Sequence, residues 1–242
     1  MKKRFLIAGA HGGIGEDLAI RLAKAGNEVI ATMRHPDQAS DDCRSLVKEI
    51  RQLDVTDQNS VAKGLADFSA DSPLHGFAYC IGSIDLMPLK SARTENFLRA
   101  YELNVLGAVR MLQVLEKSLK AGQGSVVLFS SIAAQSGFAN HTVISTAKAA
   151  VEGLAKSLAA EWSSYVRVNV IAPSLTDTAI AKPLTSSPTM REAIEKMHPI
   201  ARLGSASDSA AVAEFLLSPD ASWITGQIFP VDGGRSTLRV KG

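Results

Sequence analysis

Short apolar runs alternate with longer amphipathic stretches along the whole chain. The short runs are too brief for helices, and glycines or polar residues close them, which is typical of strands buried on both faces. Such strands are predicted at residues 5–8, 29–32, 50–55, 74–81, 125–129 and 166–172, with a last one inside 224–234. Apolar residues at helical spacing predict helices within 14–25, 94–120, 147–162 and 207–217, and a short, loose helix within 37–47.

This alternation predicts one α/β domain over residues 1–242, built on a doubly wound parallel sheet of about seven strands with helices on both faces. No repeat, low-complexity run or linker divides the chain. The stretch 179–200 is rich in Pro, Ser and Thr, and we expect it to form a mobile lid over a substrate.

Composition narrows the class of protein without naming a function. Of the 242 residues, 46% are hydrophobic and 21% are charged, and the net charge is +2. This balance gives no reason to expect nucleic acid or a membrane as a partner. No stretch approaches the roughly 20 apolar residues of a membrane span, and glycines interrupt the first apolar run, which favours a strand over a signal peptide. Cys43 and Cys80 are too few for a disulfide framework, so we expect reduced thiols in a cytoplasmic protein.

A glycine turn joins the first predicted strand to the first helix, with the spacing Gly9-x-x-x-Gly13-x-Gly15. Glycines let a backbone approach a pyrophosphate, and a helix N-terminus offers free N–H groups and a partial positive charge. The turn therefore predicts a dinucleotide site, and the alternative is a tight turn without a ligand.

The tip of the second strand, Thr32-Met33-Arg34, indicates which dinucleotide is bound. NAD-binding domains commonly place a carboxylate at this point for the ribose hydroxyls, whereas Arg34 can bind a 2′-phosphate with two hydrogen bonds. NADP(H) is therefore expected in preference to NAD(H), and the alternative for Arg34 is a solvated surface residue. His11 in the glycine turn is placed near the same phosphate, and its plainer interpretation is a loop histidine without a ligand.

A second motif lies between residues 128 and 154. A strand ends at Ser130-Ser131, a glycine-containing loop follows, and the next helix carries Lys148. This segment resembles the active-site segment of the short-chain dehydrogenase/reductase family. The resemblance covers residues 5–234, and includes the glycine spacing and the ending 224–234. In that family a tyrosine stands four residues before the lysine, where this chain has Ile144.

The resemblance implies a Rossmann-type fold and an NAD(P)-dependent oxidoreductase that acts on a small alcohol or carbonyl compound. It assigns the hydrogen bond to the substrate oxygen to Ser131, a ribose contact to Lys148 and a proton-relay water to Asn104. It also implies a homodimer or homotetramer, formed through the alanine-rich helix within 147–162. The cofactor-binding residues expected from the resemblance and from the glycine turn are Gly9, His11, Gly13, Ile14, Gly15, Arg34, Asp54, Val55, Cys80, Gly82, Lys148, Pro173, Thr176 and Thr178.

Several positions depart from the family pattern. Ile144 cannot exchange a proton, the segment 79–82 reads Tyr-Cys-Ile-Gly in place of Asn-Asn-Ala-Gly, and Ser174 replaces a glycine. Asn104 has a second interpretation as a residue at a local kink, because Asn is unfavourable inside a helix.

Without the tyrosine, a transferred proton needs another source. Tyr101 and Tyr165 are not obvious substitutes, and Ser145 is expected to point elsewhere along its helix. One hypothesis is an enzyme whose proton follows a water path from His141 or Thr142. The competing hypothesis is a protein that binds NADP(H) without turnover, as a redox sensor or as a subunit of an oligomer.

Overall fold

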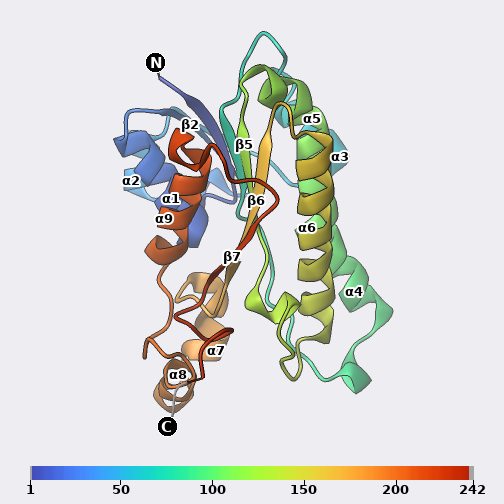
Figure 1. The fold of residues 1–242 in the computed structure, drawn as a ribbon, viewed down its shortest axis with the longest axis vertical. Helices are drawn as coiled ribbons and strands as arrows, with labels where there is room; N and C mark the ends of the chain where they lie inside the picture. Colours follow the sequence, from blue (N-terminus) through green and yellow to red (C-terminus); the bar gives the residue numbers. More distant parts are fainter. Residues whose placement is uncertain (1, 240–242) are drawn as a thin grey trace.

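The computed structural model of the chain describes residues 2–239. Its centre is a seven-stranded sheet in the order β3-β2-β1-β4-β5-β6-β7, and every neighbouring pair of these strands is parallel (Figure 1). The strands are β1 (Arg4–Ala8), β2 (Glu28–Met33), β3 (Glu49–Gln52), β4 (Gly76–Tyr79), β5 (Ser125–Phe129), β6 (Arg167–Pro173) and β7 (Ile228–Val231). The predicted parallel sheet of about seven strands is therefore confirmed.

Helices cover both faces of the sheet, which makes the architecture doubly wound (Figure 1). One face packs against α1 (Gly13–Lys24), α2 (Asp41–Leu46) and α9 (Ala206–Leu217). The other face packs against α3 (Gln58–Gly64), α5 (Gly107–Ala121) and α6 (Thr142–Glu161). The remaining helices are α4 (Thr94–Tyr101), α7 (Lys182–Thr185) and α8 (Pro188–Glu195).

The apolar strands are buried because successive side chains point to opposite faces of the sheet. In β1, Leu6 belongs to the core under α5 and α6, while Phe5 and Ile7 belong to the core under α1 and α9. Each such side chain stabilises the fold by about 1.5–3 kcal/mol when it is removed from water. Both faces must therefore be covered, as the continuous apolar runs predicted.

The order of the strands reverses between β1 and β4. The chain runs outward from β1 through β2 and β3, and then crosses to β4 on the other side of β1. Loops that follow β1 and β4 consequently leave the sheet in opposite directions. In open parallel sheets, ligands bind in the crevice at this switch point, beyond the carboxyl ends of the strands.

Two strands, β3 and β4, are shorter than the predicted runs 50–55 and 74–81. β3 ends at Gln52, because the carboxylate of Asp54 accepts hydrogen bonds from the amide and hydroxyl of Thr56 and turns the chain out of the sheet. α3 starts directly afterwards, capped by Asp57, whose carboxylate accepts from the amide of Asn59 at 2.8 Å.

The helix predicted over 94–120 is divided into two. A π-helical segment, Glu102–Leu106, separates α4 from α5 and contains the buried Asn104. Tyr79 of β4 donates its hydroxyl hydrogen to the carbonyl of Leu103 at 2.6 Å, and so pairs a carbonyl inside the irregular turn. Asn104 thus sits at a local irregularity of the helix, as its second interpretation proposed.

Alanines of α6 serve the core rather than a free surface. Ala147, Ala155 and Ala159 are buried, the latter two in the core beneath the sheet. The exposed small residues of this helix include Ala149, Gly153, Ser157 and Ala160. An oligomer formed through α6 stays a prediction, and these exposed residues are the ones available for it.

Within residues 2–239, no helix is long and apolar enough to cross a membrane. Cys43 and Cys80 are free thiols, as expected. Burial raises the pKa of both thiols, so neither is activated as a nucleophile near neutral pH.

The contact between Tyr79 and Gly107 gives a first testable prediction. A Cβ at Gly107 would overlap the Tyr79 hydroxyl and lie 2.9 Å from Val55 Cγ2, so Gly107→Ala should destabilise the fold by about 1–3 kcal/mol. Gly137→Ala is the matched control, because its new Cβ would meet no atom within 4 Å and its φ is not left-handed, so it should change the free energy of unfolding by less than ~1 kcal/mol. Urea denaturation measures both. If Tyr79→Phe does not reduce the cost of Gly107→Ala in the double variant, the overlap with the hydroxyl is not its cause.

Candidate functional site

The turn between β1 and α1 brings two pieces of backbone into close contact. Gly9 has a φ of +84°, a left-handed conformation that favours glycine, and its amide donates to the carbonyl of Thr32 at 2.9 Å. A Cβ at Gly15 would overlap the carbonyl oxygen of Gly9 and lie 3.0 Å from Cys80 Cβ. No side chain of the described residues caps the N-terminus of α1. Its first N–H groups are therefore available to an anion.

A cavity of about 410 Å³ opens beside this turn. Its walls come from the glycine turn, the end of β2 and the segments that follow β3 and β4. Of the residues expected to bind a cofactor, it is lined by Gly9, His11, Gly13, Ile14, Arg34, Val55, Cys80, Gly82 and Thr178. The fold thus gathers into one cavity residues that lie far apart in the sequence.

Two of the predicted cofactor residues, Gly15 and Asp54, line neither this cavity nor the second one described below. Gly15 lies inside α1, where it allows the helix to approach β1. Asp54 holds the turn after β3, and its hydrogen bonds from Thr56 lower the pKa of its carboxyl. A contact between the Asp54 carboxylate and a cofactor therefore stays a prediction.

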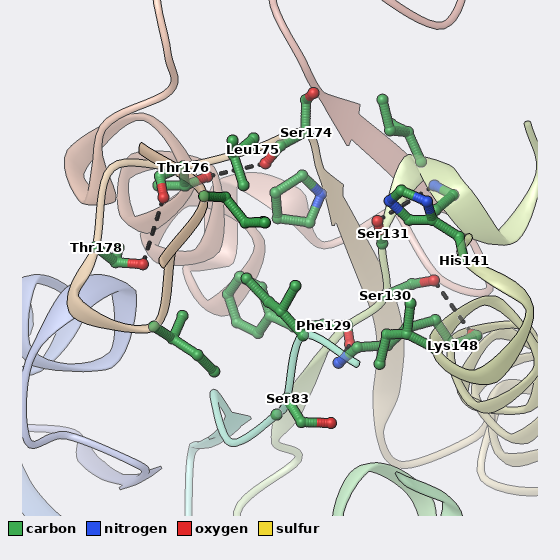
Figure 2. Close-up of a pocket in the computed structure, with 18 of the residues that line it drawn as sticks. Ser83, Phe129, Ser130, Ser131, His141, Lys148, Ser174, Leu175, Thr176 and Thr178 are labelled. Atoms are coloured by element: carbon green, nitrogen blue, oxygen red, sulfur yellow. Dashed lines mark hydrogen bonds between the residues drawn. The ribbon is translucent and has the colours of Figure 1, made fainter. Parts of the chain in front are cut away.

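A second cavity of about 430 Å³ continues the first (Figure 2). Both are lined by Ile14, Cys80, Gly82 and Thr178, so they form one cleft. The walls of the second cavity are mostly apolar, and its polar groups come from α6, from the loop before it and from the segments that follow β4, β5, β6 and β7. Ser131, Lys148, Pro173, Thr176 and Thr178 all line it, as the sequence predicted.

Lys148 is buried in the floor of this cleft, with 7% of its surface exposed. Its ammonium group donates to the carbonyl of Phe129 at 2.9 Å, which directs it toward the end of β5 (Figure 2). Burial lowers the pKa of Lys148 to about 8, because the charged form loses its water. The side chain can therefore both hold and release a proton near neutral pH.

Asn104 reaches the same place from the other side of Gly82. Its amide group donates to the carbonyl of Ala100 at 2.8 Å and to the hydroxyl of Ser83 at 3.2 Å. Its carbonyl oxygen is buried and has no hydrogen-bond partner among the described residues. A Cβ on Gly82 would lie 3.0 Å from this oxygen and 3.0 Å from Lys148 Nζ. An unpaired buried acceptor thus lies close to the buried ammonium group.

Comparison with known proteins identifies the family. A family model described as enoyl-(acyl carrier protein) reductase matches residues 9–236. The chain belongs to the short-chain dehydrogenase/reductase family. Members of this family are NAD(P)-dependent oxidoreductases that act on CH–OH or carbonyl groups.

Individual relatives share the whole length of the chain. L-xylulose reductase of Caenorhabditis elegans is 32% identical over 248 residues, which cover 97% of this chain and 96% of the relative. The 7alpha-hydroxysteroid dehydrogenase of Escherichia coli K12 is 32% identical over 249 residues, which cover 95% of this chain and 92% of the relative. The solved structure of ElxO with NADP bound superposes with a TM-score of 0.88 at 28% identity, and 98% of this chain and 100% of that chain are covered. Relatives of equal similarity thus carry the names of a sugar reductase and a steroid dehydrogenase.

Ser131 and Ile144 of this short-chain dehydrogenase/reductase face the second cavity. The oxygen of Ser131 accepts from the amide of Ala133 at 3.2 Å, which leaves its hydroxyl hydrogen for another acceptor. Ile144 lies one turn of α6 before Lys148 and is 5% exposed. An aliphatic side chain therefore lines the same cavity as Ser131 and Lys148.

Of the other proton donors considered from the sequence, only His141 lines a cavity of the cleft. His141 lines the second cavity, and its Nδ1 lies 2.7 Å from the carbonyl of Ala139, so Nε2 is the nitrogen left for other partners. Thr142 and Ser145 line neither cavity. Tyr79, Tyr101 and Tyr165 line neither cavity as well, and they are all the tyrosines of the chain.

The structure adds polar residues that the sequence did not single out. Ser174 lies 2.8 Å from Nε2 of the buried His198 and accepts from Arg235 at 3.3 Å. Beneath Lys148, the buried Glu152 accepts from the hydroxyl of Ser130 at 2.8 Å. The sequence showed that Ser174 replaces the family glycine. It could not show the partners of Ser174, because His198 and Arg235 lie 24 and 61 residues further along the chain.

The segment 179–200, expected to be a lid, forms one side of the second cavity. It contains α7 and α8, and Ile180, Leu184, Ile194 and Met197 line the cavity. These side chains give this side of the pocket an apolar surface. The mobility of the segment stays a prediction.

Buried Lys148 should make stability depend on pH. Between about pH 8 and its ordinary pKa of 10.5, Lys148 is protonated in the unfolded chain but not in the folded one, so the free energy of unfolding should rise with pH. Relative to Lys148→Met, the wild-type protein should gain on the order of 3 kcal/mol across this window. Denaturant titrations at several pH values measure the difference. Parallel curves for the two proteins would show that the lysine is not desolvated.

Proposed function

We propose that this protein is an NADP(H)-dependent oxidoreductase of a small carbonyl or alcohol substrate, with a proton-transfer site that lacks the family tyrosine. The observation that carries the proposal is the single cleft that connects the glycine turn to Ser131 and Lys148. The alternative is an NADP(H)-binding protein without turnover.

The residues of the cleft fit a dinucleotide from end to end. The glycine turn and the uncapped N-terminus of α1 would hold the pyrophosphate, and Arg34 the 2′-phosphate. Lys148 would contact the nicotinamide ribose, and Thr178 would meet the carboxamide. The bound cofactor supplies or accepts the hydride. A solved relative with NADP bound supports this assignment.

The substrate oxygen would be held by Ser131. Its free hydroxyl hydrogen faces the cavity, so it can donate to a carbonyl or alcohol oxygen. The apolar walls keep water away from the reacting carbon, and they strengthen this hydrogen bond. Ser131 therefore positions the oxygen beside Lys148.

We assign the proton of the reaction to Lys148. With Ile144 at the position of the family tyrosine, Lys148 is a cleft residue whose pKa, about 8, suits a general acid near neutral pH. The unpaired oxygen of Asn104 lies near this ammonium group and can accept from a water that returns the proton. His141 is the second candidate, because it lines the same cavity with one free nitrogen.

Ile144 also favours the alternative, in which the protein binds NADP(H) but catalyses no reaction. Its buried aliphatic group removes a proton donor from the cavity wall. A protein of this kind would bind NADPH tightly and consume none of it with any carbonyl compound. Cofactor binding and cofactor oxidation must therefore be measured separately.

Compartment and assembly are part of the proposal. Two free cysteines fit a reducing compartment such as the cytoplasm. The small exposed residues of α6 would let a second copy approach closely in a homodimer or homotetramer. Sedimentation at micromolar concentration distinguishes these assemblies from a monomer.

Arg34 should determine the choice of cofactor. Fluorescence titration should give tighter binding of NADPH than of NADH, and Arg34→Ser should weaken NADPH binding by about 10- to 100-fold because a charge-assisted pair is lost. Binding of NADH should stay unchanged. The control Arg239→Ser removes an exposed arginine that lines neither cavity and should alter neither affinity. Equal loss of both cofactors in Arg34→Ser would contradict the assignment.

Lys148 should determine the pH dependence of turnover. With a panel of ketones and aldehydes, NADPH oxidation should fall as pH rises through about 8, because Lys148 loses its proton there. Lys148→Met should reduce the rate by about 10²- to 10⁴-fold, whereas Ile144→Tyr should raise it.

Three results separate the possibilities. A loss in His141→Asn, with Lys148→Met still active, would assign the proton to His141. Unchanged turnover in Ile144→Tyr would show that Ile144 does not limit the rate. If the wild-type protein binds NADPH tightly but does not oxidise it, and Ile144→Tyr does oxidise it, the results would favour the protein without turnover.

A further inference from the structure

The charge of the second cavity is one-sided. Among the described residues that line it there is no Asp or Glu, whereas Lys148 and Arg235 both contribute to its walls. Lys148 is explained by the proposed proton transfer. Arg235 comes from the segment after β7 and has no role in that reaction.

Arg235 is directed into the cavity by its own turn. Gly233 and Gly234 have φ values of +61° and +86°, and the carboxylate of Asp232 accepts from the amides of Gly234 at 2.9 Å and Ser236 at 2.8 Å. The carboxylate of Asp232 therefore binds backbone amides and forms no ion pair with the guanidinium group of Arg235. The turn fixes where the Arg235 side chain starts.

Neutral partners hold the guanidinium group. It lies over the ring of Phe138, with its central carbon 4.7 Å from the ring centre, and donates to Met197 Sδ at 3.4 Å and to Ser174 Oγ at 3.3 Å. No carboxylate pairs with it within residues 2–239. Burial lowers the pKa of Arg235, and the nearby charge of Asp232 offsets only part of this effect. A half-buried cation without a carboxylate partner favours an anionic ligand.

A buried histidine sets the direction of the Ser174 hydroxyl. His198 is 4% exposed, and its Nδ1 lies 2.9 Å from the carbonyl of Ile194, so this nitrogen carries the hydrogen. In the neutral ring Nε2 then accepts from Ser174, whose oxygen is left to accept from Arg235. The chain His198, Ser174, Arg235 thus positions the guanidinium as one unit.

Ser174, which accepts a hydrogen bond from Arg235, lies away from Lys148 in the cavity. Figure 2 shows Ser174 on the opposite side of the view from Lys148 and Ser83, with Ser131 at a height between Ser174 and Lys148. A ligand with its carbonyl oxygen at Ser131 can therefore extend its other end toward Ser174. The apolar walls between these points suit a short carbon chain.

We propose that Arg235, positioned by Ser174 and His198, binds an anionic group of the substrate, so that the substrate class is a small carbonyl or hydroxy compound carrying a carboxylate or phosphate. This inference rests on the proposed function, because it concerns the substrate end of the same cleft.

Binding of matched ligand pairs tests the inference without requiring turnover. In one arm, levulinate and 5-oxohexanoate are compared with their methyl esters; in the other, dihydroxyacetone phosphate is compared with dihydroxyacetone. Calorimetry on the protein with and without NADPH should show about 10- to 100-fold tighter binding of the anion in at least one arm, and the arm identifies carboxylate or phosphate.

Variants assign the preference to Arg235. Arg235→Met keeps an unbranched apolar stem and should abolish the preference, with binding of the neutral partners and of NADPH unchanged. Arg235→Lys should retain part of it, because the charge stays but the two-pronged geometry is lost. The control Arg239→Met should keep it in full. Circular dichroism confirms that each variant is folded.

The outcomes for the two proposals can be told apart. Equal or absent binding of anion and neutral partner in both arms, or a preference that survives in Arg235→Met, overturns the anion site. A lack of NADPH binding or oxidation overturns the proposed function, while the measurements without cofactor still decide the anion site.

Discussion

Parallel pairing of all seven strands is the constraint on which the rest of this protein depends. Because every strand points the same way, the loops at the carboxyl ends of β1, β4, β5 and β6 meet at one edge of the sheet. The glycine turn follows β1, Ser131 follows β5 and Ser174 follows β6. Reversal of the strand order between β1 and β4 opens the crevice that these loops line. The site is therefore a consequence of topology before it is a matter of particular side chains.

Close contacts of small residues hold this edge together. Gly15 lets α1 touch the carbonyl of Gly9, and Gly107 lets α5 touch the hydroxyl of Tyr79. The second contact reaches the chemistry, because Tyr79 also binds the carbonyl of Leu103 in the π-helical segment that carries Asn104. A tyrosine in a core strand thus supports the irregular turn that brings an unpaired oxygen toward Lys148.

Burial determines the electrostatics of the cleft. Lys148 lies among apolar walls with a single carbonyl partner, so its pKa falls to about 8. The guanidinium group of Arg235 lies over the ring of Phe138 and donates to the hydroxyl of Ser174. Both groups are positive, and within the described lining residues no carboxylate balances them. The proposed anion site rests on this one-sided charge, and relatives of similar sequence carry the names of enzymes for different substrates.

The sequence by itself determined the class of fold and the cofactor cleft. Short continuous apolar runs and helical spacing are local properties, so β5 was predicted at its observed bounds, and the glycine turn indicated the start of α1. Ser131 and Lys148 followed from the resemblance to the family, because their spacing along one segment is characteristic of it. Turn chemistry had more influence than hydrophobicity at the end of β3, where Asp54 ends the strand early.

Only the tertiary structure decided the break in the helix at 102–106, which depends on Tyr79 from another strand. It alone joined His198, Ser174 and Arg235, and it turned Ala155 and Ala159 of α6 toward the sheet. These features arise from contacts between residues distant in the chain. No local pattern records such contacts, because each partner by itself has the composition of an ordinary loop or helix.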